Sequence, residues 1–369
     1  MGNPLLAIRA LGQSIWLDNI SRELLDTGKL AQLIAEDGIC GVTSNPTIFE
    51  KAIGHSDLYD DSLRAAAREG LDARSTFFKV TYADIRDGAD LLRPRWDETD
   101  GQDGHISFEL LPEQARDALG SVGEAKRIFK ELDRPNVLIK VPATPEGVDA
   151  FRELTAAGIS VNVTLLFAVS RYEEIANAYV EGLERRAAAG EPIDRLASVA
   201  SFFVSRVDGK VDKRLEELGH PELQGIAAVA NAKLAYRSFQ RIFSGPRWEA
   251  LAAKGANVQR PLWASTSTKN PAYPDTLYVD TLIGPDTVNT MPEATIDATR
   301  EHAHPARTID AEVDEAVAHI TELERLGVDL DEILVHELVD EGVESFTASF
   351  DSLIATIDEK ARALAPAEA

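Results

Sequence analysis

Residues 136–147 have the sequence Asn-Val-Leu-Ile-Lys-Val-Pro-Ala-Thr-Pro-Glu-Gly, and this stretch decides the fold. Three apolar residues precede Lys140 and Val141 follows it, a pattern typical of a strand that is covered on both faces. The prolines and the glycine between Pro142 and Gly147 predict a turn that opens the next helix. The stretch therefore predicts the strand, turn and helix from which parallel α/β sheets are built.

Lys140 is an unusual residue for a strand covered on both faces. Loss of hydration disfavours the charged form of a buried lysine, and an uncharged amine attacks carbonyl carbons. Lys140 is therefore a candidate for Schiff-base formation. The alternative is structural: the side chain reaches out of the strand end to water, or it faces a carboxylate.

The alternation of short apolar runs and helical patterns continues on both sides of this stretch. Eight strands separated by helices predict a parallel sheet, and eight such strands close a barrel. We therefore expect an α/β fold, a (β/α)8 TIM barrel with extra N-terminal and C-terminal helices. The expected strands are residues 14–18, 41–45, 105–110, 137–142, 160–167, 197–204, 259–266 and 286–291.

The expected helices fill most of the remaining chain. They are residues 21–34, 112–132, 170–188, 207–218, 226–242, 312–326 and 330–364, with two or three more between 46 and 95. Ser170 and Glu173 form a capping box at one start, and breaks are expected near Gly120 and Gly342. Residues 270–310 are rich in Pro, Thr and Asp and predict one long loop system around the eighth strand. The length permits two domains, but no linker is visible, so a single domain over residues 1–369 is expected.

The composition limits the possible partners. Asp and Glu number 62 against 38 Lys and Arg, so the formal net charge of −24 argues against nucleic acid and against an anionic membrane surface. Cys40 is the only cysteine, which excludes an internal disulfide framework and a cysteine-cluster metal site. Apolar segments long enough for a signal sequence or a membrane span are missing. We therefore expect a cytoplasmic protein, with its oligomeric state, monomer or homodimer, left open.

Polar residues close most of the predicted strands, where a TIM barrel gathers its active site. Singly, such residues are more often helix caps or turn residues. Together they supply what an imine mechanism needs: an amine, two carboxylates for proton transfer, amide donors and cations for a phosphate. The candidates are Asp18, Thr43, Asn45, Glu109, Lys140, Asn162, Thr164, Ser201, Arg206, Ser267 and Lys269.

Five segments of the chain, in the same order, resemble the transaldolase family. They are residues 15–19, 41–49, 137–144, 159–167 and 200–208. The resemblance extends over nearly the whole chain, whose length is similar to the longer bacterial single-function subgroup of the class I aldolase-like Schiff-base barrels. It implies transfer of a dihydroxyacetone unit from sedoheptulose 7-phosphate to glyceraldehyde 3-phosphate, which gives erythrose 4-phosphate and fructose 6-phosphate in the non-oxidative pentose phosphate pathway.

The resemblance also implies a role for each candidate residue, without a metal or an organic cofactor. Lys140 would form the imine, and Asp18 would take the proton of the donor C4 hydroxyl during cleavage. Glu109, through a water held with Thr164, would move protons while the carbinolamine dehydrates. The implied residues for binding sugar-phosphate substrates are Thr43, Asn45, Asn162, Ser201, Arg206, Ser267 and Lys269.

Three other interpretations of the same residues remain open at this point. A cofactor-free aldolase would use Lys140 and release the three-carbon unit to water. A barrel hydrolase would use Asp18 and Glu109 as its carboxylate pair but would leave Lys140 without a function. A sugar-phosphate-binding barrel without catalysis would use Lys140 only as a phosphate contact.

Overall fold

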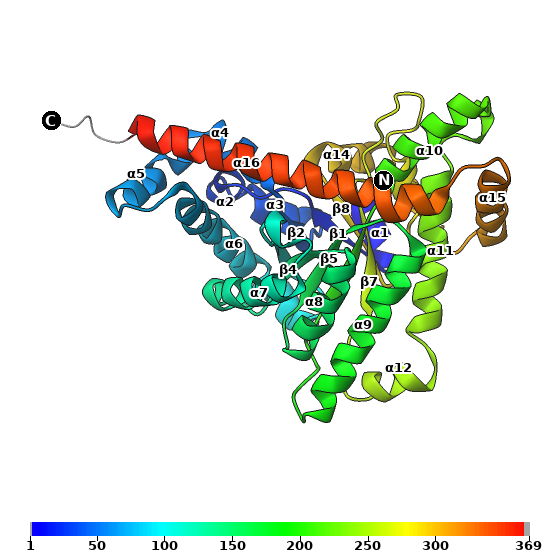
Figure 1. The fold of residues 1–369 in the computed structure, drawn as a ribbon, viewed down its shortest axis with the longest axis horizontal. Helices are drawn as coiled ribbons and strands as arrows, with labels where there is room; N and C mark the ends of the chain where they lie inside the picture. The colour runs from blue at the N-terminus through cyan, green and yellow to red at the C-terminus, as the bar shows by residue number, and fades with distance from the viewer. Residues whose placement is uncertain (1, 365–369) are drawn as a thin grey trace.

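Eight parallel strands close into a barrel in the computed structural model, which describes residues 2–364 (Figure 1). Each strand pairs with its neighbours in chain order, and β1 pairs with β8 to close the ring. The predicted (β/α)8 barrel is therefore confirmed. Residue 1 and residues 365–369 of the expected single domain lie outside the described part of the chain. The strands are Gln13–Leu17 (β1), Gly41–Thr43 (β2), His105–Glu109 (β3), Val137–Pro142 (β4), Val161–Leu166 (β5), Ser198–Phe203 (β6), Gln259–Ala264 (β7) and Thr287–Met291 (β8).

Helices surround this barrel and connect its strands (Figure 1). They are Pro4–Ala10 (α1), Arg22–Asp26 (α2), Lys29–Glu36 (α3), Pro46–Gly54 (α4), Asp60–Arg68 (α5), Ala73–Glu98 (α6), Ala118–Leu132 (α7), Pro145–Ala156 (α8), Val169–Ala188 (α9), Val204–Leu218 (α10), Ala227–Ile242 (α11), Gly245–Ala252 (α12), Leu277–Asp280 (α13), Glu293–His302 (α14), Val313–Arg325 (α15) and Leu338–Leu364 (α16). A π-helical segment, Glu332–Glu337, leads into α16.

Side chains alternate along each strand between the barrel interior and the helix layer. On β4, Ile139 and Val141 join the large core between strands and helices, whereas Leu138 joins a separate cluster inside the barrel. Trp16 and Val199, from β1 and β6, belong to that same inner cluster. The period of two then turns Lys140 inward as well, one layer above Leu138. Apolar residues fill the barrel directly below this layer, and polar residues lie at both ends: those of the site at the carboxyl ends of the strands, and a buried group that includes Ser14 and Asp103 at the amino ends.

Several helix boundaries differ from the sequence-based expectation. The helix expected over residues 21–34 is divided at Gly28, whose φ of +73° ends one helix and precedes the next. The expected capping box at Ser170 is wrong, because α9 begins one residue earlier with Ala168 as its N-cap. The segment 270–310 contains the predicted eighth strand, but the expected loop system around it is interrupted by two helices, α13 and α14.

The C-terminal helix α16 is continuous through Gly342, so the break expected there is wrong. It runs across the molecule from the side of α10 and α15 to the side of α4 and α5 (Figure 1). On the way it packs against β5, α4, α5 and α6. The packing explains why this position is a glycine, since a Cβ there would come within 2.7 Å of the Leu165 side chain. The glycine provides close packing on the barrel and does not end the helix.

Candidate active site

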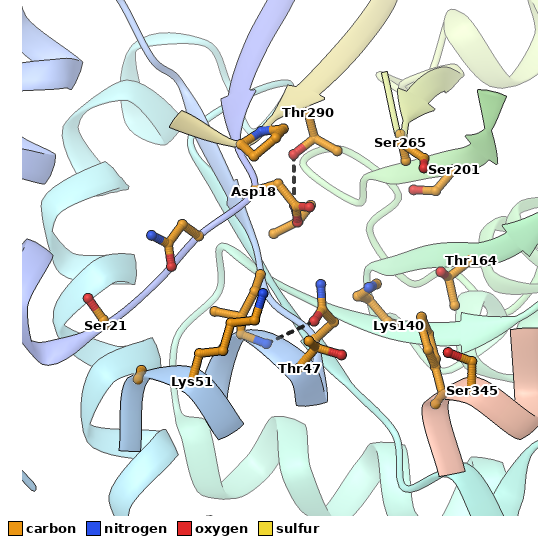
Figure 2. Close-up of a pocket in the computed structure, with 18 of the residues that line it drawn as sticks. Asp18, Ser21, Thr47, Lys51, Lys140, Thr164, Ser201, Ser265, Thr290 and Ser345 are labelled. Carbon is orange, nitrogen blue, oxygen red and sulfur yellow. Dashed lines mark hydrogen bonds between the residues drawn. The ribbon is translucent and has the colours of Figure 1, made fainter. Parts of the chain in front are cut away.

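A cavity of about 650 Å³ opens at the carboxyl ends of the strands (Figure 2). Its volume suits a small organic molecule such as a sugar phosphate. Eight of the eleven residues predicted from the sequence line it: Asp18, Thr43, Asn45, Lys140, Thr164, Ser201, Arg206 and Lys269. The labelled side chains of Asp18, Lys140 and Thr164 in Figure 2 point toward this common space from three different strand ends.

Lys140 is buried, with 6% of its side chain exposed, and it contacts three groups. Its Nζ lies 2.6 Å from Glu109 Oε2 and donates a hydrogen bond to the Ser44 carbonyl at 3.1 Å. The Phe346 ring centroid lies 5.8 Å from the same nitrogen, within cation–π range. The lysine is thus buried, faces a carboxylate and also reaches the cavity. An amine in contact with a proton acceptor can lose its proton when a carbonyl substrate arrives.

The strand register places Glu109 next to Lys140. Glu109 of β3 is the register partner of Lys140, and Lys140 is in turn the partner of Asn162 on β5. Burial raises the pKa of Glu109, the charge of Lys140 opposes this rise, and the charge of Asp18 adds to it. Because the raised pKa favours the protonated form, this carboxyl group can accept a proton from the amine and return it. Glu109 contacts the amine without being part of the main cavity lining.

Asp18 is held by a chain of two threonines. Thr43 donates from its hydroxyl to Asp18 Oδ1 at 2.6 Å, and its oxygen lies 2.7 Å from the Thr290 hydroxyl, a contact drawn in Figure 2. Because the single Thr43 proton is used on the carboxylate, Thr290 donates in the second bond. Burial raises the pKa of Asp18, whereas the Thr43 hydrogen bond and the charge of Lys140 lower it. The chain fixes the orientation of a carboxylate that faces the cavity.

Two asparagines flank Lys140 with different surroundings. Asn45 is the N-cap of α4, because its side-chain oxygen accepts a hydrogen bond from Ile48 N at 3.0 Å. Its NH₂ group therefore remains as the donor of this cavity-lining side chain. Asn162 is fully buried, donates to Ser107 Oγ at 3.0 Å and accepts from Ser201 Oγ at 2.6 Å. It lies behind the cavity wall, where Ser201 is the member of the pair that lines the cavity.

The opposite side of the cavity is cationic. Arg206 follows β6 directly, because α10 begins at Val204 without an intervening loop. Burial lowers the pKa of Arg206, which the charge of Glu341 partly offsets. Within residues 2–364, no carboxylate forms an ion pair with Arg206 or with the exposed Lys269. Two cations that face a cavity without a protein counter-ion form a site for an anion such as a phosphate.

Ser265, not Ser267, is the serine that lines the cavity beside these cations. Its φ of +55° turns the chain at the end of β7, and its hydroxyl lies 3.0 Å from the Ser205 hydroxyl. Ser267 Oγ instead contacts Thr295 Oγ1 at 2.6 Å, and the structure does not bring it to the cavity. A positive φ on a serine has no signature in the sequence, so the direction of each serine was not predictable.

Sequence reasoning also missed other residues that line the cavity, among them Lys51, Thr290 and Phe346. Thr290 is a polar residue near the carboxyl end of the eighth strand. The search for polar residues at strand ends, which found the predicted residues, would therefore have found Thr290 as well. Lys51 lies on α4, away from any strand end, and Phe346 comes from α16, more than 200 residues after Lys140 in the chain. Both are placed by helix packing, for which the sequence carries no local signal.

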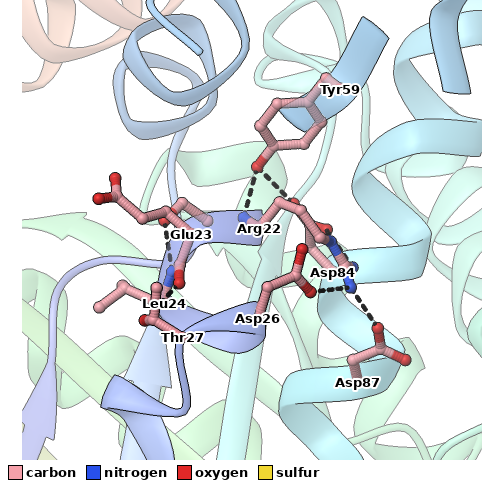
Figure 3. Close-up of polar contacts among 9 residues, drawn as sticks. Arg22, Glu23, Leu24, Asp26, Thr27, Tyr59, Asp84 and Asp87 are labelled. Carbon is pink, nitrogen blue, oxygen red and sulfur yellow. Dashed lines mark hydrogen bonds and ion pairs between the residues drawn. The ribbon is translucent and has the colours of Figure 1, made fainter. Parts of the chain in front are cut away.

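The rim of the cavity is anchored by a cluster of charged residues around Arg22, which is flanked by two rim residues, Ser21 and Glu23 (Figure 3). The Arg22 guanidinium pairs with the buried Asp84 of α6 and with the exposed Asp87 at 2.7 Å. The Tyr59 hydroxyl donates to Asp84 Oδ2 at 2.7 Å and accepts from Arg22 N at 2.8 Å. Helix α6 thereby holds the loop that follows Asp18.

Removal of the buried carboxylate of this cluster should destabilise the protein. We expect Asp84→Ala to lower the free energy of unfolding by about 2–3 kcal/mol, because it leaves Arg22 and the Tyr59 hydroxyl without their buried acceptor. The matched control, Asp87→Ala, removes a carboxylate that is 53% exposed and should cost less than about 1 kcal/mol. Denaturant unfolding measures both variants. Equal losses would contradict the assignment of Asp84 as the anchor.

The described residues contain neither a cluster of metal ligands nor a membrane-spanning helix. Between residues 2 and 364, no three His, Cys, Asp or Glu side chains lie close enough together to hold a metal ion. None of the helices in the same range is both long and apolar enough to cross a membrane.

Comparison with known proteins gives one consistent result. A family model described as Transaldolase/Fructose-6-phosphate aldolase matches residues 15–357. A protein named Transaldolase from Parafrankia sp. (strain EAN1pec) is 50% identical over 364 residues, 98% of each chain. Proteins of the same name from Acidothermus cellulolyticus and Thiobacillus denitrificans are 51% and 50% identical over 360 and 353 residues. These alignments cover 97% and 95% of this chain, and 96% and 98% of the relatives.

Proposed function

Because the chain belongs to the transaldolase/fructose-6-phosphate aldolase family, we propose that it transfers a dihydroxyacetone unit between sugar phosphates through an imine on Lys140. The donor is sedoheptulose 7-phosphate and the acceptor glyceraldehyde 3-phosphate, as in the non-oxidative pentose phosphate pathway, and the place of reaction is the cytoplasm. The observation that carries the proposal is the buried Lys140 amine, 2.6 Å from Glu109, in one cavity with Asp18 and Asn45.

The reaction begins with the phosphate and the amine. Arg206, with Ser265 and Lys269, holds the phosphate of the donor ketose, which directs the other end of the sugar toward Lys140. The ammonium of Lys140 gives a proton to Glu109, and the free amine adds to the C2 carbonyl. Glu109 then returns a proton, through a water held with Thr164, to the hydroxyl that leaves the carbinolamine. The iminium ion that results carries a positive charge beside the bond that breaks.

Carbon-carbon cleavage follows at the other side of the cavity. Asp18 takes the proton of the C4 hydroxyl, the C3–C4 bond breaks, and the electron pair moves into the iminium ion to give an enamine. The aldose leaves, and the NH₂ group of Asn45 and the hydroxyl oxygen of Ser201, which both line the cavity, hold the hydroxyls of the three-carbon fragment, with Asn162 behind them. Ser201 fixes the orientation of Asn162. The acceptor aldehyde enters, and the same steps run in reverse.

A transfer assay tests the proposed function against the release of free dihydroxyacetone. With fructose 6-phosphate and erythrose 4-phosphate, the enzyme should form sedoheptulose 7-phosphate and glyceraldehyde 3-phosphate in equal amounts. Without erythrose 4-phosphate, dihydroxyacetone should form much more slowly. An equal rate of dihydroxyacetone release with and without the acceptor would instead assign the chain to the aldolase activity that shares this family description.

The threonine chain beside Asp18 predicts a change in pH dependence. A carboxylate base loses activity as the pH falls through its pKa, and Thr43 lowers the pKa of Asp18 by a hydrogen bond to its charged form. Thr43→Val removes that bond, so the pKa of Asp18 rises and the acidic limb of the kcat profile moves to higher pH. Thr43→Ser keeps the hydroxyl and should restore the wild-type limb. An unchanged limb in Thr43→Val would exclude this role for Thr43.

A further inference from the structure

A bulge in β5 allows one face of α16 to pack closely on the carboxyl-terminal end of the barrel. Val163 pairs with Ala200 but Leu166 pairs with Phe202, so β5 has one extra residue at this point. The extra residue places Leu165 at a φ of +54°, a conformation that is strained for a leucine. Its side chain fills the space left by Gly342, where a Cβ would come within 2.7 Å of it.

The contact between Leu165 and Gly342 fixes which residues of α16 face the cavity. Phe346 follows Gly342 by one helical turn and therefore lies on the same face of the helix. One turn further on, Ser349 accepts a hydrogen bond from the Thr47 hydroxyl of α4 at 2.9 Å. On the other side, Glu337 and Glu341 pair with Lys210 of α10 at 3.3 and 2.5 Å. These contacts hold the helix in both position and rotation.

Phe346 is the apolar residue that this arrangement brings to the reacting nitrogen. Its ring centroid lies 5.8 Å from Lys140 Nζ and 6.4 Å from the Phe203 ring, and both phenylalanines line the cavity. Most of the other residues that line the cavity are polar. An apolar ring at this distance excludes water from the covalent intermediate and places no acid beside it.

We propose that Phe346 determines how the enamine on Lys140 divides between transfer and hydrolysis; this rests on the proposed function. In hydrolysis, the enamine C3 takes a proton from water, hydroxide adds to C2, and the C2–N bond breaks to give dihydroxyacetone and the free amine of Lys140. One water is consumed in total. The ring of Phe346 excludes that water, so the enamine persists until an aldehyde arrives.

The experiment measures the rate of dihydroxyacetone release from fructose 6-phosphate alone, divided by the rate of transfer to erythrose 4-phosphate. Phe346→Ala should raise this ratio about tenfold, because water then reaches the enamine. Phe346→Leu retains an apolar side chain and should raise the ratio by a smaller factor. The control is Phe350→Leu, one turn along α16, where the ring packs on Phe77 outside the cavity and the ratio should not change.

An unchanged ratio in both Phe346 variants, with wild-type circular dichroism, would overturn the inference. If Phe346→Ala does not fold, Phe346→Leu alone shows whether the ratio of release to transfer rises. The wild-type enzyme separates this result from a failure of the proposed function. If it transfers the three-carbon unit but the ratio does not respond to residue 346, only the role of Phe346 is wrong.

Discussion

Lys140→Met is expected to lower kcat for transfer by at least about 10⁴-fold, because methionine fills the same space but offers no nucleophilic nitrogen. Lys269, the other lysine in the mechanism, holds the phosphate at the opposite side of the cavity and does not reach C2 of the ketose in this arrangement. The matched control is Lys254→Met, which makes the same exchange at an exposed position away from the cavity and should keep wild-type activity. Steady-state kinetics with fructose 6-phosphate and erythrose 4-phosphate measure both variants.

The Lys140 variant should still fold, which makes its loss of activity interpretable. Removing the ammonium leaves Glu109 buried without its charge partner, and burial already raises the pKa of that carboxyl toward the neutral form. The variant should therefore give a wild-type circular dichroism spectrum and still bind the phosphate end of the substrate. If a folded Lys140→Met enzyme kept more than about a tenth of wild-type kcat, covalent catalysis at this residue would be excluded.

Asp18→Ala is expected to separate imine formation from cleavage. Loss of a positioned base should slow the cleavage step that it catalyses by about 10²–10⁴-fold. Imine formation should continue, because it uses Lys140 and Glu109. Borohydride reduction should then trap the intact six-carbon phosphorylated ketose on Lys140 instead of the three-carbon fragment. Mass spectrometry distinguishes the two adducts directly.

A matched variant removes the charge of Asp18 and keeps its shape. Asp18→Asn can still accept the Thr43 hydrogen bond, so it should also accumulate the six-carbon adduct while disturbing the site less than alanine does. Absence of any adduct in both variants would show that Asp18 acts before or during imine formation. A three-carbon adduct at the wild-type rate would show that another group is the base.

The barrel could be predicted because its strands are buried on both faces. In β4 and β5 the otherwise apolar strands carry Lys140 and Thr164 near their carboxyl ends, where the side chains line the cavity, so the strands and the candidate residues were found by the same rule. Helix boundaries were less accurate, since an N-cap is decided by backbone geometry. The residues from Ser170 to Glu173 have the sequence of a capping box, but α9 begins at Val169 with Ala168 as its N-cap.

The parts of the site that the sequence could not supply are those set by distant packing or by unusual backbone angles. Ser265 faces the cavity because of a positive φ, and Phe346 does so because Gly342 rests on the Leu165 bulge. Neither feature leaves a periodic pattern in the residues around it. Thr290 could have been predicted, because it lies near the carboxyl end of β8 as Lys140 and Thr164 lie near the ends of their own strands.

The most direct test of the account is to identify the residue that becomes covalently joined to the ketose. The wild-type protein is incubated with fructose 6-phosphate, reduced with borohydride, digested and mapped by mass spectrometry. The account predicts one reduced three-carbon fragment on the peptide that contains Lys140, and none on any other lysine. A protein that transfers the three-carbon unit but carries no adduct, or carries it on another lysine, would contradict the account.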